Sequence, residues 1–171
     1  VRDTPLSHQP RVTDAAVSPR GGTSLYDSIA KIIEKTIASI NKMTETPAQV
    51  GVFILTDGME NSSVLWSKEK IGEQIKLLEA PPYNWQFYFA AANQDAMAVG
   101  TSLCMKASHC VAYGQERSHM RAAFYSASTN FCLQKQSLPS HFRDDDRAGC
   151  DPTRGERDSN RARNWRNLIS L

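Results

Sequence analysis

The sequence VGVFILTDG, residues 50–58, decides the fold that we expect for this chain. Its first seven residues form an almost continuous apolar run, which is typical of a strand buried on both faces of a parallel sheet. The pair Asp57-Gly58 that follows is a turn signal. We therefore expect residues 50–56 to form a central parallel strand that carries Asp57 at its carboxyl end.

Amphipathic helices are expected on both sides of this strand along the chain. Apolar residues recur at helical spacing over residues 25–40, and Ser24 with Asp27 resembles a capping box at the start of that helix. A second helix is expected to begin at Ser67, and the two prolines at positions 81–82 prevent its continuation. The central strand is thus expected to lie between two helices in the sequence.

The rest of the chain continues this alternation of strands and helices. An aromatic run over residues 85–89 predicts a strand, and residues 95–103 predict a short helix. A weaker strand is expected around residues 110–113, and a helix over residues 116–131. This order predicts an α/β fold, with a mostly parallel, doubly wound, Rossmann-like sheet and flanking helices. Because only about three strands are found, we expect the N-terminal part of a larger domain to be absent.

Length and charge suggest one domain with an appendage. The 171 residues suffice for one ordinary domain, and the net charge is only +2. Positive and negative side chains balance over residues 1–132, which we interpret as a partial domain without nucleic-acid binding. Residues 133–171 lose the apolar periodicity and are expected to form a disordered charged tail. No apolar run approaches the roughly 18 residues that a membrane span needs, so no membrane contact is expected.

The cysteines and the first residue bear on the location of the protein. The four cysteines form no Cys-x-x-Cys pair and are expected to be reduced and mostly buried. A cytoplasmic location is expected. The chain begins with Val1 rather than Met, so we interpret it as a fragment or a processed chain.

Polar residues follow the predicted strands at the edge where an open parallel sheet binds ligands. Hydroxyl and carboxylate oxygens are the donors that Mg²⁺ prefers, and Thr23 and Asp57 fit that role. The spacing alone leaves an alternative, in which Thr23 or Ser24 caps a helix and Asp57 only makes a turn.

Further polar side chains are candidates for the same rim. Ser24, Asn61, Asn93 and Asp95 are possible rim residues, and Asp95 serves equally well as the N-cap of the next helix. Glu60 is interpreted as a solvated loop residue.

Two segments resemble the second half of a von Willebrand factor type A (VWA) domain. They are PRGGTSLYDSI, residues 19–29, and VFILTDGMENS, residues 52–62, with an amphipathic helix between them. The segments WQFYF, residues 85–89, and ANQDA, residues 92–96, are similar to stand-alone, intracellular-type members of that family. The likeness spans about residues 1–131.

The resemblance implies a doubly wound α/β fold with a metal-ion-dependent adhesion site, which usually holds Mg²⁺. In the family this site combines an Asp-x-Ser-x-Ser loop after the first strand with a Thr and an Asp from two later loops. Thr23 and Asp57 match the Thr and the Asp, but no Asp-x-Ser-x-Ser occurs in the chain. The resemblance therefore implies a partial site, in which Mg²⁺ binds weakly or not at all.

The leading functional hypothesis is a protein-binding module that is not an enzyme. In a complete site, a carboxylate of the partner protein would take a coordination position on the metal. The first alternative is a metal-dependent hydrolase or phosphatase-like enzyme, with Asp57 as nucleophile or metal ligand. The second is a truncated product without independent function, whose exposed sheet edge aggregates. No Gly-x-Ser-x-Gly elbow or Walker motif supports an enzyme.

Overall fold

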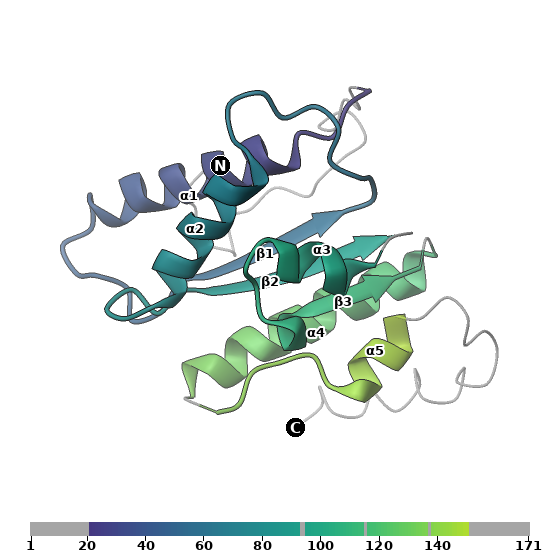
Figure 1. The fold of residues 1–171 in the computed structure, drawn as a ribbon. Coiled ribbons are helices and arrows are strands. Elements are labelled where there is room, and N and C mark those ends of the chain that lie inside the picture. Colours follow the sequence, from purple (N-terminus) through teal and green to yellow (C-terminus); the bar gives the residue numbers. More distant parts are fainter. Residues whose placement is uncertain (1–20, 93–94, 115, 137, 151–171) are drawn as a thin grey trace, which may run out of the picture.

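The structure is a computed structural model that describes residues 21–92, 95–114, 116–136 and 138–150. In chain order its elements are α1 (Leu25–Ile40), β1 (Gly51–Thr56), α2 (Lys68–Glu79), β2 (Gln86–Ala92), α3 (Ala96–Ser102), the short 3-10 helix η3 (Ala107–His109), β3 (Cys110–Tyr113), α4 (Arg117–Lys135) and α5 (Asp144–Cys150). Helices α1 and α2 cover one face of the sheet, and α4 and α5 cover the other (Figure 1). The predicted α/β class with a parallel sheet is confirmed, and the arrangement is compatible with a Rossmann-like fold.

The sheet has the strand order β1-β2-β3, and both pairs of strands are parallel. In the first pair, Gly51 lies opposite Gln86 and the register continues to Thr56 opposite Ala91. Strand β2 is therefore the central strand, and β1 lies at an edge of the sheet that the described residues form. Within the described residues, the prediction that residues 50–56 form a central strand is therefore wrong. An apolar run predicts that helices cover both faces of a strand, but it does not predict which strands lie beside it.

The first core lies between the sheet and the helices α1 and α2. Ile29 and Ile33 of α1 pack with Ile54 of β1 and with Ile71 and Ile75 of α2, and all five side chains are buried. The helical stripe in the sequence thus predicted α1 correctly. The side chain of Ser24, in contrast, makes no capping hydrogen bond, so the predicted capping box is wrong.

The second core lies on the opposite face of the sheet. Tyr88 and Val111 from the strands pack with Ala123 and Ala127 of α4. Phe142 and Cys150, from the segment that follows α4, complete this core and are 2% and 0% exposed. The expectation that the core ends near residue 132 is therefore wrong, because the chain continues to contribute buried side chains up to Cys150.

Hydrogen bonds tie the segment 138–150 to the sheet. The backbone N–H of Phe142 donates to the carbonyl oxygen of Ser108 at 2.9 Å. The Arg147 guanidinium donates to the carbonyl oxygens of Cys110 and Ala107. A few specific contacts, rather than a periodic apolar pattern, order this segment, and for that reason the sequence pattern missed it. Residues 151–171 of the expected tail lie outside the described residues.

Two further observations concern the described part of the chain. None of the helices described is both long and apolar enough to cross a bilayer. All four cysteines are free thiols. Cys110 and Cys150 are buried, whereas Cys104 and Cys132 are exposed, so the expectation of mostly buried thiols holds for two of them.

Candidate functional site

Thr23 and Asp57 lie near the edge where the parallel strands end. Thr23 lies two residues before α1, and Asp57 directly follows β1. The Thr23 hydroxyl lies against Gly58, since a Cβ built on Gly58 would be only 2.8 Å from Thr23 Oγ1. Asp57 itself is exposed. The fold thus places the Thr23 side chain beside the Asp57-Gly58 turn.

Asn61 is paired with the backbone of Thr23. Its Oδ1 accepts a hydrogen bond from the Thr23 N–H at 2.8 Å, and its own N–H donates to the Thr23 carbonyl oxygen at 3.0 Å. Close packing continues at Gly22, where an added Cβ would lie 2.8 Å from Ser62 Oγ. The loop of residues 58–67, here called the rim loop, therefore runs alongside the start of α1.

Glu60 fixes the rim loop from within. Its Oε1 accepts hydrogen bonds from the N–H groups of Ser62 and Ser63 at 2.9 and 2.7 Å. Its Oε2 accepts from the Tyr26 N–H at 3.0 Å and from the Ser63 hydroxyl at 2.7 Å. Burial raises the pKa of the Glu60 carboxyl, but these hydrogen bonds outweigh it and lower the pKa to about 2. The interpretation of Glu60 as a solvated loop residue is therefore wrong.

Asp27 fixes the same loop from the side of the helix. Its carboxylate accepts hydrogen bonds from three successive backbone N–H groups, those of Val64, Leu65 and Trp66, the shortest at 2.8 Å. The hydrogen bond from Val64 is the largest cause of a pKa for Asp27 below its ordinary value. Together, Asp27 and Glu60 form a carboxylate clasp that joins α1 to the rim loop. No sequence pattern could have found the clasp, because its partners lie more than 30 residues apart.

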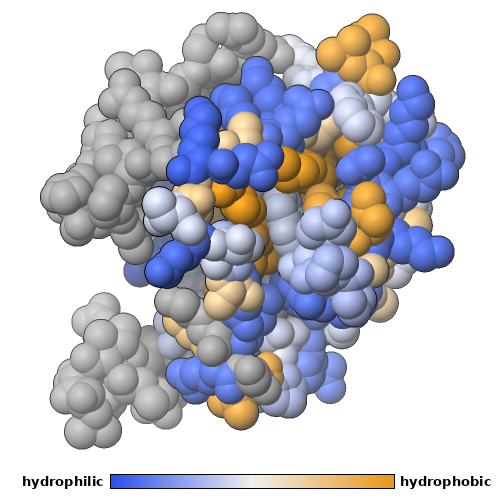
Figure 2. Space-filling model, turned by 90° about the vertical axis from the view of Figure 1, so that its left-hand side faces the viewer, coloured by the Kyte–Doolittle hydropathy of each residue, from blue (hydrophilic) through white to orange (hydrophobic). Residues whose placement is uncertain are grey.

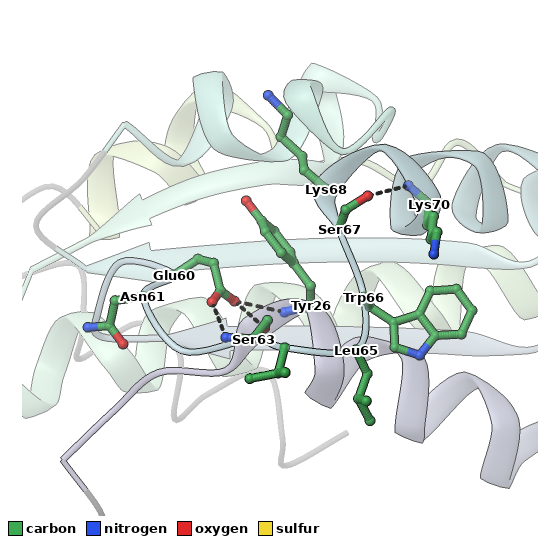
Figure 3. A pocket seen from close by; sticks show the side chains of 10 residues that line it. Tyr26, Glu60, Asn61, Ser63, Leu65, Trp66, Ser67, Lys68 and Lys70 are labelled. Carbon is green, nitrogen blue, oxygen red and sulfur yellow. Dashed lines mark hydrogen bonds between the residues drawn. The ribbon is translucent and has the colours of Figure 1, made fainter.

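The rim loop exposes large apolar side chains to solvent, although hydrogen bonds to Asp27 and Glu60 fix its backbone. Met59, Val64 and Leu65 are 72%, 87% and 76% exposed. The neighbouring Trp66 and Tyr26 are partly buried against the first core. An open pocket of about 510 Å³ lies beside this part of the loop (Figure 3). It is lined by Tyr26, Glu60, Asn61, Ser63, Val64, Leu65, Trp66, Ser67, Lys68 and Lys70.

The remaining predicted rim residues have other environments. Asp95 accepts a hydrogen bond from the Ala98 N–H at 2.9 Å and so caps α3, as the alternative interpretation held. Asn93 lies outside the described residues. Tyr113 at the end of β3 donates its hydroxyl to the Thr56 carbonyl oxygen at 3.2 Å. Burial raises the pKa of Tyr113, and the charge of Asp57 raises it further, which places Tyr113 near this rim as well.

The residues present match a Mg²⁺ site only in part. Thr23 and Asp57 are oxygen donors of the kind that Mg²⁺ prefers, but the ion needs near-octahedral coordination. The carboxylates of Asp27 and Glu60 already accept hydrogen bonds through both of their oxygens. Over the described ranges, no group of three or more His, Cys, Asp and Glu side chains is placed to hold a metal ion.

Comparisons of the chain with protein-family models, with curated proteins and with solved structures gave no match. The evidence on function is therefore the geometry of the rim loop and the resemblance of residues 19–29 and 52–62 to a VWA domain.

Proposed function

We propose that this chain is a protein-binding module of the VWA type, without enzymatic activity, and that it contacts its partner through the rim loop. One observation carries the proposal: the loop is held by the carboxylate clasp, yet it exposes Met59, Val64 and Leu65. Exposed apolar side chains that gather at one place on a protein surface mark interaction sites. Loops held by a rigid scaffold commonly carry binding residues.

The clasp supports binding because it reduces the entropy that the loop loses when a partner docks. Seven hydrogen-bond contacts to Asp27 and Glu60 come from the loop itself, so its backbone is already in one conformation. The exposed apolar side chains then contribute favourably to the free energy of binding, because a partner that covers them removes apolar surface from water. A partner with an apolar side chain that fits the pocket beside Trp66 would use both features.

Thr23 and Asp57 form a partial metal site beside the rim loop, and binding of the partner does not require it. In the resemblance to the VWA family, they match the Thr and the Asp of its metal site. With two donors present, we propose that Mg²⁺ binds this chain weakly or not at all. Contact through the rim loop needs no metal, so binding would persist in the presence of a chelator.

Site-specific photocrosslinking tests the proposal. A photoreactive amino acid is placed at Leu65 in the full chain, and the matched control carries it at Leu77, which is 54% exposed on α2. In an extract of the source cells, we expect a discrete adduct from position 65 that is not formed from position 77. The captured protein is then purified and titrated against the wild-type chain.

Variants of the loop give the second half of the test. Val64→Asp combined with Leu65→Asp should weaken binding of the purified partner at least tenfold, or about 1.4 kcal/mol, with little change in melting temperature. The adduct and the titrated affinity should both survive addition of EDTA. Equal adducts from positions 65 and 77, or an affinity that the double variant leaves unchanged, would refute the rim loop as the binding surface.

A further inference from the structure

The backbone groups of β1 can be assigned to the two sides of the strand. The Gln86 N–H donates to the Val50 carbonyl oxygen at 3.0 Å, and β1 and β2 are parallel. Because such a ladder uses every second residue of a strand, Val52, Ile54 and Thr56 also face β2. The N–H and C=O groups of Gly51, Phe53 and Leu55 therefore point to the opposite side, where none of the strands described pairs with β1.

Within its six described residues, β1 carries none of the sequence features that protect natural edge strands from pairing. Such strands commonly carry charged residues, proline or a bulge. The six residues of β1 are GVFILT, none of them charged and none of them proline, and the register to β2 runs without interruption. A strand of this composition is a ready template for one more strand.

Apolar side chains lie beside the edge on the α4 face of the sheet. On the face of α4, the half-buried Phe53 ring meets the Phe124 ring edge-on, with centroids 5.3 Å apart, and Phe124 is 46% exposed. Hydrophobic side chains also gather in the middle of the surface at the end where the strands begin (Figure 2). Ile40 and Val50, which flank the turn before β1, are only half-buried.

We propose that this edge pairs with the same edge of a second copy of the chain, in antiparallel orientation about a two-fold axis at Phe53. Phe53 would lie opposite Phe53 of the second copy, and Gly51 opposite Leu55. In an antiparallel ladder each such pair exchanges both of its hydrogen bonds, so every outward-pointing group of these three residues is satisfied. The two-fold symmetry closes the assembly at two copies.

The side chains suit this register. Both Phe53 rings would lie on the α4 face, each with its own Phe124 beside it, and aromatic cross-strand pairs are favourable. Gly51 has no side chain, and a Cβ there would overlap the Phe131 ring, so the Leu55 side chain of the second copy would lie beside Phe131. Continued past the strand, the register places Asp57 opposite Gln49, so no like charges meet.

Oligomeric state and amide exchange test the proposal on the full 171-residue chain. Sedimentation velocity over a range of concentrations should show a monomer that converts to a dimer. Hydrogen exchange at the Phe53 and Leu55 amides should slow at least tenfold as the dimer forms. The amides of Val52 and Ile54, which already face β2, should be protected at every concentration.

A pair of variants separates this edge from other surfaces. Phe124→Glu adds a charge beside the edge and should raise the dimer dissociation constant at least tenfold. The control is Met97→Glu, at a side chain that is 45% exposed on α3, which packs against β2 and β3 rather than against the β1 edge. It should leave the dissociation constant unchanged.

Four results would each overturn the proposal. The first is a chain that stays monomeric at millimolar concentration. The second is slow exchange of the Phe53 and Leu55 amides at every dilution, because the edge would then be covered by the chain itself. The third is a dimer in which those two amides exchange as fast as in the monomer. The fourth is a dissociation constant that Phe124→Glu leaves unchanged or that Met97→Glu raises equally.

Discussion

Glu60→Gln tests whether the carboxylate clasp holds the rim loop. The Gln side chain keeps one acceptor oxygen, which can still receive the N–H groups of Ser62 and Ser63. Its amide group then faces the Tyr26 N–H, which loses its acceptor, and the Ser63 hydroxyl must rotate. One hydrogen bond to a charged group is therefore lost outright. We expect a loss of about 1–2 kcal/mol, reduced by the partial exposure of the carboxylate, and a fall in melting temperature of about 2–8 °C.

The loss of stability caused by Glu60→Gln should become smaller as the pH falls. The pKa of Glu60 is about 2 in the folded protein against an ordinary value of 4.5, so its stabilisation is complete above about pH 4.5. The stabilisation is lost as the pH falls towards 2, because the folded carboxylate is then protonated as well. The difference in melting temperature between the wild type and Glu60→Gln should thus be largest near pH 7 and should narrow below pH 4.5.

Thermal unfolding followed by circular dichroism, at several pH values, measures this difference. The matched control is Glu73→Gln, at an exposed residue of α2, which should change the melting temperature by no more than the equivalent of about 0.5 kcal/mol. A Glu60→Gln protein as stable as the wild type at pH 7, or a difference that stays constant from pH 7 to pH 3, would refute the clasp.

Three other predictions follow from the two cores and the rim. Phe142→Ala should lower the free energy of unfolding by about 3 kcal/mol or more in denaturant titrations, since Phe142 is 2% exposed; a loss under about 1 kcal/mol would mean that its segment does not pack. Burial lowers the pKa of His109 to about 4, below its ordinary value of 6.5, so protonation favours the unfolded chain. Stability should therefore fall between pH 6.5 and pH 4, and calorimetry should show a smaller fall for His109→Phe. With only Thr23 and Asp57 as donors, isothermal titration should show Mg²⁺ binding no tighter than millimolar; stoichiometric micromolar binding would reveal further ligands.

Local patterns predicted the elements whose formation depends on neighbours in sequence. Helix α1 was predictable because its buried residues, from Leu25 to Ile33, recur at helical spacing. Strand β1 was predictable because an apolar run ends at a turn. Asp95 could be read as an N-cap from its place before α3, and it does cap that helix.

The remaining features depend on contacts between distant residues. Asp27 looks like part of a capping box, but its oxygens bind backbone N–H groups of the rim loop. Helix α5 has few apolar residues, and its segment is ordered by Phe142, by Cys150 and by the hydrogen bonds of Arg147. Whether a strand lies at the edge of the sheet depends on which other strands pair with it, and the residues of the strand itself do not reveal this. In each case the deciding partner lies too far along the chain for a local pattern to reveal it.

The clasp also bears on how this surface could be diversified. Asp27 binds the loop through the backbone N–H groups of Val64 and Leu65, so their side chains take no part in holding it. Almost any residue except proline could stand at these two positions without disturbing the loop. The length of the loop, in contrast, is fixed, because an insertion would shift the N–H groups away from the carboxylates. The domain thus offers a framework in which selection, natural or in a combinatorial library, could alter specificity at two adjacent positions with little cost in stability.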